Sequence, residues 1–407
     1  MKILQINTTV NTGSTGRIAE DIGKVLMANG HESYIAFGRG NQSSQSNLIR
    51  IGSKMDFFLH GLRTRFFDRH GFGSKKATQQ LICEIEKIKP DAIGLHNLHG
   101  YYLNIEVLFE YLKSNHIPVL WTLFDCWAFT GHCTYFDDID CKKYQTQCEK
   151  CPKIDKYPNS LFVDNSFKNF TDKKKFFTSL ANIDFVVHSD WLKGLVKQSY
   201  LKNYDVNSLP SGIDLDLFSP TSSTIKKKFN IVGKKIILGC ASPWSERKGF
   251  KDFFELRKKL DKNSLIVLIG LSKKQLNNLP DGIMGIPRTD SIEELVMWYS
   301  AADVFVNPTY QDNFPTTNIE ALACGTPVIT YNTGGSPEAV DDKTGRVVEK
   351  GNIEGLFKSI KEMQTLNRET LTNDCRERAL ERFNKNDRYK DYIMLFENLI
   401  SNQTKLN

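Results

Sequence analysis

No uninterrupted apolar run in the 407-residue chain approaches the roughly 18–20 residues that a membrane-spanning helix needs. The sequence also opens without the charged segment and apolar core of a secretory leader, because MKILQIN leads directly into an apparent buried strand. We therefore expect a cytoplasmic protein, either free or held at the inner face of the cytoplasmic membrane.

No internal repeat of solenoid length is present either, which argues against an array of small repeated units. The composition, with 40% hydrophobic and 25% charged residues, is typical of a soluble globular protein with two or three domains. The formal net charge of +7 favours anionic partners, such as phosphates, nucleic acid or acidic lipid headgroups. The charge alone does not choose among them.

Short apolar strands alternate with amphipathic helices through most of the chain. The pattern predicts a first series at residues 2–7, 17–30, 31–37, 76–88, 90–96, 104–115, 117–124 and 183–189, and a second series that begins at residue 234. Alternation of this kind predicts an α/β fold with doubly wound parallel sheets. Two series imply two domains, whose strand ends would face a common crevice.

The predicted boundaries follow from where this rhythm stops and restarts. Residues 1–207 form the first domain, with a cysteine-rich excursion over 126–178, and residues 208–384 form the second. The tail over 385–407 contains RYKDYIMLFENLI, an amphipathic helix that we expect to cross back to the first domain.

Two carboxylates stand eight positions apart in QDNFPTTNIEALACGTPVI, residues 311–329. The pattern predicts a strand, a loop and then a helix that starts near Thr316 and Thr317, whose free N–H groups could cradle a phosphate. Asp312 could accept hydrogen bonds from sugar hydroxyls, and Glu320 could bind a diol such as ribose. The bland alternative is a helix cap and a solvated acid.

The region YSAADVFVNPTYQDNFPTTNIEALACGTPVIT, with NTGGSPEAV and LPSGIDLDLF, resembles the retaining glycosyltransferases of family 4. LHNLHGYYLN and WTLFDCWAFTGHC resemble a bacterial branch that acts in colanic-acid-type exopolysaccharide and capsule synthesis. The resemblance covers nearly the whole chain and is strongest over residues 236–346. It implies the GT-B fold, in which two Rossmann-like domains face each other across a cleft.

The resemblance also implies roles for the second domain. Asp312 would contact the donor sugar, and Glu320 would bind the ribose. Most of the family has a glutamate at the position of Asp312, so the side chain here is one methylene shorter. Pro315 has no N–H, so the hydroxyls and amides of Thr316 and Thr317 become the expected phosphate donors. Phe314, in the same loop, is predicted to line the substrate site.

The stretch ASPWSERKGF, residues 241–250, places two cations between a strand and a helix. By resemblance, Lys248 would grip the donor pyrophosphate and take part in catalysis. Ser242 stands where the family usually has an arginine, so Arg247 would supply the second cation. Fixed cations stabilise the charge that develops on a leaving diphosphate. Otherwise, both residues are solvated members of a first helical turn.

Candidates in the first domain are weaker. NTGSTGR offers Gly16 in the first loop, where backbone could approach a ligand, but the motif is too common to specify dinucleotide binding. His96 follows a predicted strand and would line the donor-sugar and acceptor site by resemblance, as a catalytic candidate. Asn97, His99 and Asp125 are weaker candidates near it, and Asp125 is predicted to bind substrate.

Four cysteines in GHCTYFDDIDCKKYQTQCEKCP are spaced C-x7-C-x6-C-x2-C. Only the last pair has common zinc-knuckle spacing. A structural zinc site is predicted, with His132 as a substitute ligand; reduced core thiols or a redox pair remain open. Its ligands would be Cys133, Cys141, Cys148 and Cys151.

The segment MDFFLHGLRTRFFDRHGF, residues 55–72, mixes aromatic residues with arginines. It could be an amphipathic helix that docks a membrane or a lipid-diphosphate acceptor, or a helix that faces the core with a solvated basic side.

Together these features predict a retaining glycosyltransferase that moves a sugar from a UDP- or GDP-sugar to a glycan or lipid-linked saccharide, without a catalytic metal or a nucleic acid partner. A nucleotide-sugar epimerase, a nicotinamide dehydrogenase and a zinc-containing nucleic-acid-binding module are the alternatives. None of the three accounts for Asp312, Glu320 and Lys248 in their contexts.

Overall fold

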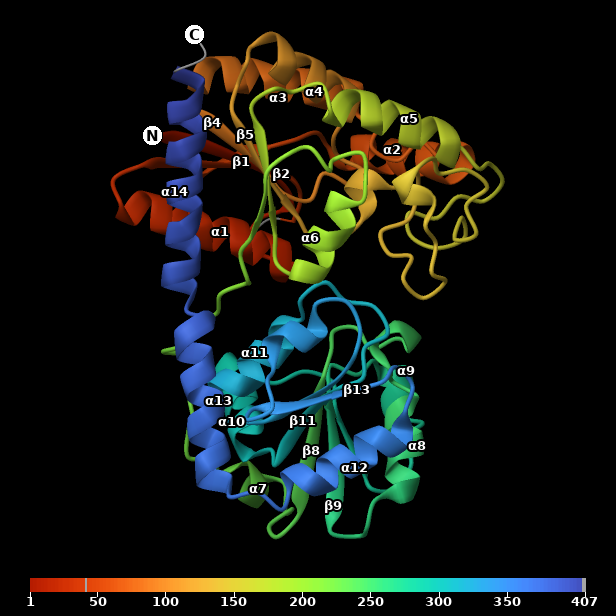
Figure 1. Cartoon of the computed structure of the whole chain (residues 1–407), viewed down its shortest axis with the longest axis vertical. Helices are drawn as coiled ribbons and strands as arrows, with labels where there is room; N and C mark the ends of the chain where they lie inside the picture. Colours follow the sequence, from red (N-terminus) through yellow and green to blue (C-terminus); the bar gives the residue numbers. More distant parts are fainter. Residues whose placement is uncertain (41, 405–407) are drawn as a thin grey trace. The chain divides into compact units, whose positions relative to one another are not determined.

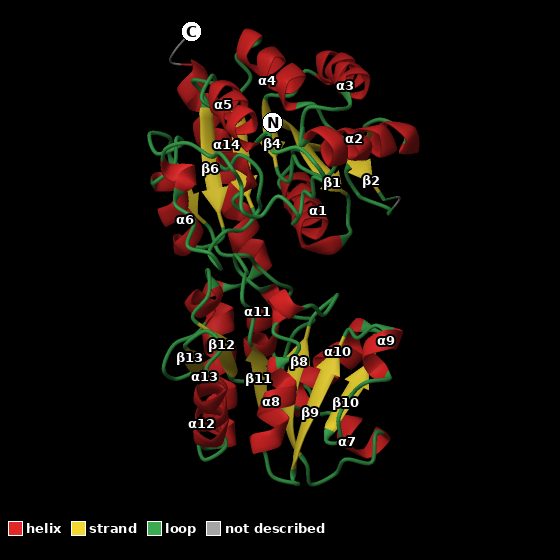
Figure 2. Ribbon diagram, turned by 90° about the vertical axis from the view of Figure 1, so that its right-hand side faces the viewer, coloured by secondary structure: helices red, strands yellow, loops and turns green. Residues whose placement is uncertain are grey.

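The computed structural model of the chain describes residues 1–40 and 42–404. Two compact units are present: unit 1 comprises Met1–Leu209 together with the segment from Arg388 onward, and unit 2 comprises Pro210–Asp387. Figure 1 shows the elements in chain order, and Figure 2 distinguishes the strands from the helices of each unit.

Unit 1 is built on a parallel sheet of seven strands in the order β3-β2-β1-β4-β5-β6-β7. Its elements are β1 (Lys2–Thr9), α1 (Gly13–Ala28), β2 (Glu32–Arg39), β3 (Asn47–Arg50), α2 (Lys54–Phe67), α3 (Lys75–Ile88), β4 (Ala92–Leu95), α4 (Ile105–Ser114), β5 (Val119–Leu123), η1 (Trp127–Phe129), η2 (Lys143–Gln145), α5 (Ser166–Phe177), β6 (Ile183–Val187), α6 (Asp190–Lys197) and β7 (Val206–Ser208).

Unit 2 is built on a parallel sheet of six strands in the order β10-β9-β8-β11-β12-β13. Its elements are α7 (Ile225–Lys228), β8 (Lys235–Cys240), η3 (Glu246–Lys248), α8 (Asp252–Lys259), β9 (Ser264–Ile269), α9 (Lys273–Leu276), β10 (Ile283–Ile286), α10 (Ile292–Ala301), β11 (Val304–Asn307), α11 (Thr316–Ala323), β12 (Val328–Tyr331), η4 (Ser336–Ala339), β13 (Gly345–Val348), α12 (Ile353–Met363) and α13 (Arg368–Arg382), followed by α14 (Lys385–Thr404).

Each sheet is buried on both faces, which explains the nearly continuous apolar strands. Side chains alternate between the faces of a strand, so Ile237 of β8 packs in one core of unit 2 while Ile236 and Leu238 pack in the other. In unit 1, α14 supplies Tyr392 and Phe396 to the core beside Ile3. The two doubly wound parallel sheets predicted from the sequence are confirmed.

The excursion predicted over 126–178 lacks strands, but it ends in α5, which the sequence pattern did not indicate. Buried Lys173 of α5 donates hydrogen bonds to the carbonyls of Trp127 and Thr130 at 2.8 and 3.1 Å. Its ammonium also lies 3.6 Å from the centroid of the Trp127 ring. These contacts fasten the end of the excursion to the loop that follows β5.

None of the helices in the described residues is long and apolar enough to cross a membrane.

Candidate functional site

Three loops of unit 2 meet beyond the carboxyl ends of β8, β11 and β12. Gly249, at φ +70°, lies so close to the Pro308 carbonyl that a Cβ would overlap it, and Gly334, at φ +55°, lies equally close to the Asp312 carbonyl. Both conformations are in the left-handed region that favours glycine. The Tyr310 amide also donates to the Arg247 carbonyl at 2.8 Å. Main-chain groups therefore hold η3 against the loop that leads into α11.

The charged side chains of these loops pair with one another. The Lys248 ammonium forms an ion pair with the Asp312 carboxylate, and the two side chains are 22% and 16% exposed. The Arg247 guanidinium donates to the Gln311 carbonyl at 2.5 Å. A partly buried pair keeps both charges compensated until a ligand with its own charges and hydroxyls arrives. The predicted sugar-binding acid and phosphate-binding cation therefore lie in direct contact.

Helix α11 presents its predicted ligand-binding residues on one side. Thr316, Thr317 and Glu320 are half-buried, as is Asp312 in the loop before them, whereas Ile319 and the alanines of the helix are buried. No side chain caps the start of the helix, where Pro315 is the N-cap. The first-turn amides and the positive end of the helix dipole are thus suited to an anion such as a diphosphate.

A buried tyrosine orients the Glu320 carboxylate. The hydroxyl of Tyr299, a fully buried residue of α10, donates to Glu320 Oε2 at 2.9 Å. Burial and the nearby carboxylate raise the pKa of Tyr299 well above its usual value, so the hydroxyl remains a donor. Tyr299 was not predicted, because 21 positions separate it from Glu320 and nothing in the local pattern links them.

Phe314 does not line a site with its side chain. It is only 7% exposed, belongs to the core of unit 2, and its ring centroid lies 6.0 Å from that of Phe383. The substrate-binding prediction is wrong for this side chain, because an aromatic ring next to an apolar core gains more from burial than from facing solvent.

In unit 1, His96 lies at the end of β4 and is 3% exposed. The amide of Gln5 donates to the Ala19 carbonyl at 2.9 Å, so its oxygen accepts from His96 Nε2 at 2.8 Å. This arrangement leaves Nδ1 as the acceptor of the ring, and Nδ1 has no hydrogen-bond partner. Burial and the nearby His188 lower the pKa of His96 to about 3, so the ring is neutral near pH 7.

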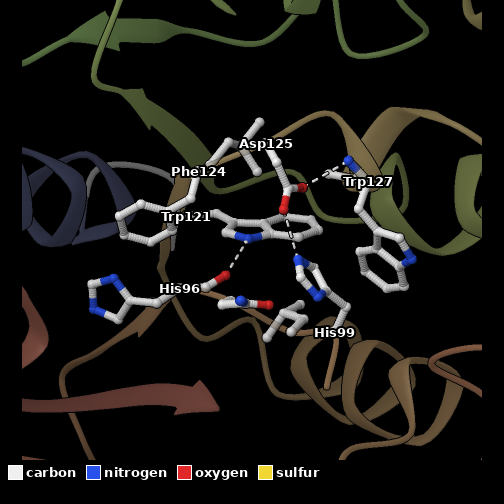
Figure 3. Close-up of a pocket in the computed structure, with 10 residues that line it drawn as sticks. His96, His99, Trp121, Phe124, Asp125 and Trp127 are labelled. Atoms are coloured by element: carbon white, nitrogen blue, oxygen red, sulfur yellow. Dashed lines mark hydrogen bonds and ion pairs between the residues drawn. The ribbon is translucent and has the colours of Figure 1, made fainter. Parts of the chain in front are cut away.

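His96, His99 and Asp125 line a pocket at the ends of β4 and β5, where the His96 ring points away from the His99–Asp125 pair (Figure 3). The Asp125 carboxylate accepts from His99 Nε2 at 2.7 Å and from the Trp127 amide at 2.9 Å. The other nitrogen of His99 lies 3.0 Å from the Tyr157 hydroxyl. With a volume of about 10 Å³, the pocket admits one hydroxyl or water rather than a sugar ring.

Gly16 does not lie in a loop. Helix α1 already begins at Gly13, and a Cβ on Gly16 would meet the Thr9 hydroxyl at 2.8 Å. The close approach at Gly16 in this structure is between α1 and the end of β1. Its approach to a ligand stays a prediction.

The four cysteines predicted to bind zinc line one small cavity, together with His132. Within residues 1–40 and 42–404, however, no three His, Cys, Asp or Glu side chains are grouped so that they could hold a metal ion. Cys133 and Cys151 instead hydrogen-bond to each other, which lowers the pKa of the Cys151 thiol to about 7. The structure does not assemble the predicted zinc site, and metal analysis of the purified protein would test it.

Comparisons with known proteins agree with these features. Residues 221–382 match the family model "Glycosyl transferases group 1". A colanic acid biosynthesis glycosyl transferase, WcaC of Escherichia coli K12, is 22% identical over 421 residues, which cover 98% of this chain and all of the relative.

Solved structures are similar over nearly the whole chain. Sucrose-phosphate synthase of Thermosynechococcus elongatus has a TM-score of 0.73 at 19% identity, over 98% of this chain and 99% of that one. Anabaena Alr3699/HepE, solved with UDP-glucose, has a TM-score of 0.69 at 13% identity, over 98% of this chain and all of that one. At these identities, the likeness shows the fold alone.

Proposed function

We propose that this chain, whose residues 221–382 match the group 1 glycosyltransferase model, is a GT-B glycosyltransferase that transfers a sugar from a nucleotide-diphosphate sugar with retention of anomeric configuration. The acceptor we propose is a growing glycan or lipid-linked saccharide of a cell-surface polysaccharide, at the inner face of the cytoplasmic membrane. The E. coli relative is named for colanic acid synthesis, which supports this class of product.

The observation that carries the proposal is the ion pair of Lys248 and Asp312 beside the start of α11. A donor offers this site a diphosphate and a sugar, which complement a cation and a carboxylate. On binding, Lys248 would exchange Asp312 for a phosphate oxygen, while Asp312 would accept hydrogen bonds from sugar hydroxyls. The exchange pairs the Lys248 ammonium with a phosphate charge and leaves the Asp312 carboxylate hydrogen-bonded to hydroxyls.

The nucleoside end of the donor would reach further along α11. Glu320 lies one turn beyond Thr316, and Tyr299 fixes the direction of one of its oxygens. A carboxylate held in this way accepts two hydrogen bonds from a ribose diol without a prior change of rotamer. The half-buried Thr316 and Thr317 are the nearest hydroxyl donors for the diphosphate.

The chemical step would need no protein nucleophile. The acceptor oxygen attacks the anomeric carbon on the face that the diphosphate leaves, and a phosphate oxygen of the leaving group takes the acceptor proton. One C–O bond forms, the C–O bond to phosphate breaks, and the nucleoside diphosphate departs. Lys248, Arg247 and the start of α11 would stabilise the negative charge that grows on the leaving group.

Unit 1 would supply acceptor contacts. Neutral His96 offers Nδ1 as an acceptor for a hydroxyl, and the His99–Asp125 pair offers a polar group that can orient a second one.

A thermal-shift screen of UDP-, GDP- and ADP-sugars tests the donor proposal. We expect one nucleotide class to raise the melting temperature of the native chain and to lose this effect in Lys248→Ala and Glu320→Ala. Lys274→Ala, a change on the exposed helix α9, is the matched control. The proposal is contradicted if the native chain binds none of these donors. It is also contradicted if Lys248→Ala and Glu320→Ala bind a donor as tightly as the native chain does.

A further inference from the structure

Helix α2 of unit 1 is amphipathic with its apolar side turned to solvent. Met55, Phe58 and Leu59 are 63%, 58% and 55% exposed, and Phe66 and Phe67 are 43% and 60% exposed. The buried residues of the helix are instead His60 and Thr64, both polar. A helix that packs on a core shows the opposite arrangement.

Polar contacts explain why this face is buried. His60 Nε2 accepts from the Gly71 amide at 3.1 Å, and His60 Nδ1 lies 2.9 Å from the Ser74 hydroxyl. A side chain on Gly73 would overlap the His60 ring. The contacts of His60 therefore fix the orientation of α2. The exposure of its apolar side follows from this orientation and not from loose packing of the helix.

The apolar side forms a continuous stripe. Met55, Leu59, Leu62 and Phe66 are separated by four, three and four positions, which places them on one helical face. Arg63 and Arg65, both exposed, lie on either side of this face. The result is an apolar stripe with a cation on each edge.

A second segment extends the stripe. The Leu161 amide donates to the Arg65 carbonyl at 2.8 Å, and the Asn165 side chain donates to the Phe67 carbonyl at 2.8 Å. The Phe162 ring stacks on that of Phe66, with centroids 6.3 Å apart, and Phe162 is 81% exposed. The exposed apolar residues of α2 together with Leu161 and Phe162 are called the apolar patch below.

We propose that the apolar patch docks on the surface of an anionic lipid bilayer. Large exposed apolar side chains beside arginines are the features of helices that lie in a membrane interface. Arg63 and Arg65 would meet anionic headgroups while Phe66, Phe162 and their neighbours enter the acyl boundary. The carboxylates closest in sequence do not oppose this arrangement: Asp56 caps its own helix, Asp68 is buried on His132, and Asp164 binds backbone amides.

This inference names the surface at which the proposed acceptor is met, but its observations do not depend on transfer. Attachment to a bilayer would hold unit 1 at the surface where lipid-linked saccharides are concentrated. Attachment through this patch would be peripheral and reversible.

Cosedimentation with vesicles tests the patch. The native chain should bind vesicles of phosphatidylcholine with phosphatidylglycerol more tightly than phosphatidylcholine alone, and added salt should weaken the binding. The double variant Phe66→Ala/Phe162→Ala should reduce the partition coefficient roughly tenfold or more. Arg63→Gln/Arg65→Gln should remove most of the preference for the anionic lipid.

The matched control is Val232→Ala/Leu380→Ala in unit 2, where the two apolar side chains are 70% and 49% exposed but lie outside the patch. It should bind vesicles like the native chain. The proposal is overturned if Phe66→Ala/Phe162→Ala and Val232→Ala/Leu380→Ala lose vesicle binding equally. It is also overturned if the native chain does not bind anionic vesicles at low salt. A native dimer that Phe66→Ala/Phe162→Ala dissociates without any vesicle binding overturns it as well, because a second copy would then cover the patch.

Two further measurements separate this proposal from the proposed function. Lys248→Ala should bind vesicles like the native chain although it has lost donor binding. Phe66→Ala/Phe162→Ala should keep the native thermal shift with the donor. Loss of vesicle binding in Lys248→Ala, or loss of the donor shift in the patch variant, contradicts the separation of the two surfaces.

Discussion

The loops that carry the charged candidate residues of unit 2 are held by main-chain contacts, whereas most of the contacts that position the candidate residues of unit 1 are made by side chains. In unit 2, Gly249 and Gly334 bring backbone against backbone, and the charged side chains sit on loops that are already fixed. In unit 1, His96, His99 and Asp125 are placed by Gln5, Tyr157 and the Trp127 amide. A site on rigid backbone suits an invariant diphosphate, while a site of side chains is the part that can change with the acceptor.

The two units also differ in their histidines. All eight histidines of the chain belong to unit 1. Burial lowers the pKa of His60 and His96 to about 3 and that of His188 to about 4, and it lowers the pKa of His70 well below its usual value. His132 differs from these four, because its hydrogen bond to Asp68 raises its pKa. The two units should therefore respond differently to mild acid.

The largest expected effect is the loss of stability of unit 1 between pH 7 and pH 5. A histidine with a depressed pKa in the folded state binds its proton only after unfolding, so stability is complete above the unfolded pKa and falls as pH drops below about 6.5. Each such histidine contributes at most about 2 kcal/mol over this range.

Limited proteolysis with mass spectrometry at the two pH values would show which unit opens. We expect cleavage in unit 1 to accelerate while cleavage in unit 2 stays nearly constant. His188→Asn, whose amide can replace the Nδ1 donor to the Leu209 carbonyl, should weaken the pH dependence, and the exposed His116→Gln should not. Equal acceleration in both units would contradict the comparison.

The next effect concerns the backbone contact of Gly249. Alanine there must adopt φ +70° and overlap the Pro308 carbonyl, whereas alanine at Gly233, with φ +83°, meets no atom within 4 Å. We expect Gly249→Ala to lower the free energy of unfolding by roughly 3 kcal/mol or more. The control Gly233→Ala should lower it by only about 1–2 kcal/mol. Urea unfolding followed by circular dichroism measures both, and equal losses would mean that the contact does not constrain η3.

Removal of the Lys248 side chain should leave the fold intact but lower transfer about 100-fold or more, since one fixed charge on a developing oxyanion is worth this much. Initial rates with saturating acceptor and varied donor would show a loss in kcat as well as in kcat/KM. If Lys248→Ala turns over at nearly the native rate, the proposal that Lys248 and Asp312 form part of the donor site is contradicted.

The smallest effect should come from the side-chain site of unit 1. His99→Gln would loosen Asp125 and lower transfer roughly tenfold, because a misoriented acceptor loses part of the advantage of alignment. The loss should appear in the KM for acceptor, and the donor thermal shift should not change. His116→Gln again serves as the control. An altered donor shift in His99→Gln would place this residue on the donor and not on the acceptor.

The two parallel sheets could be predicted from local patterns alone, because strands buried on both faces are nearly continuous apolar runs and because the apolar residues of the helices between them repeat every 3.6 residues. The sequence also indicated Lys248, Asp312 and Glu320 as candidates, since each stands just before or within the first turns of a helix that follows a strand. Features that depend on contacts between distant residues became visible in the folded chain: Lys248 pairs with Asp312, Phe314 enters the core and Gly16 packs against the end of β1. The same reason applies to Tyr299 and to the inverted helix α2, whose buried side is chosen by partners elsewhere in the chain that no local pattern records.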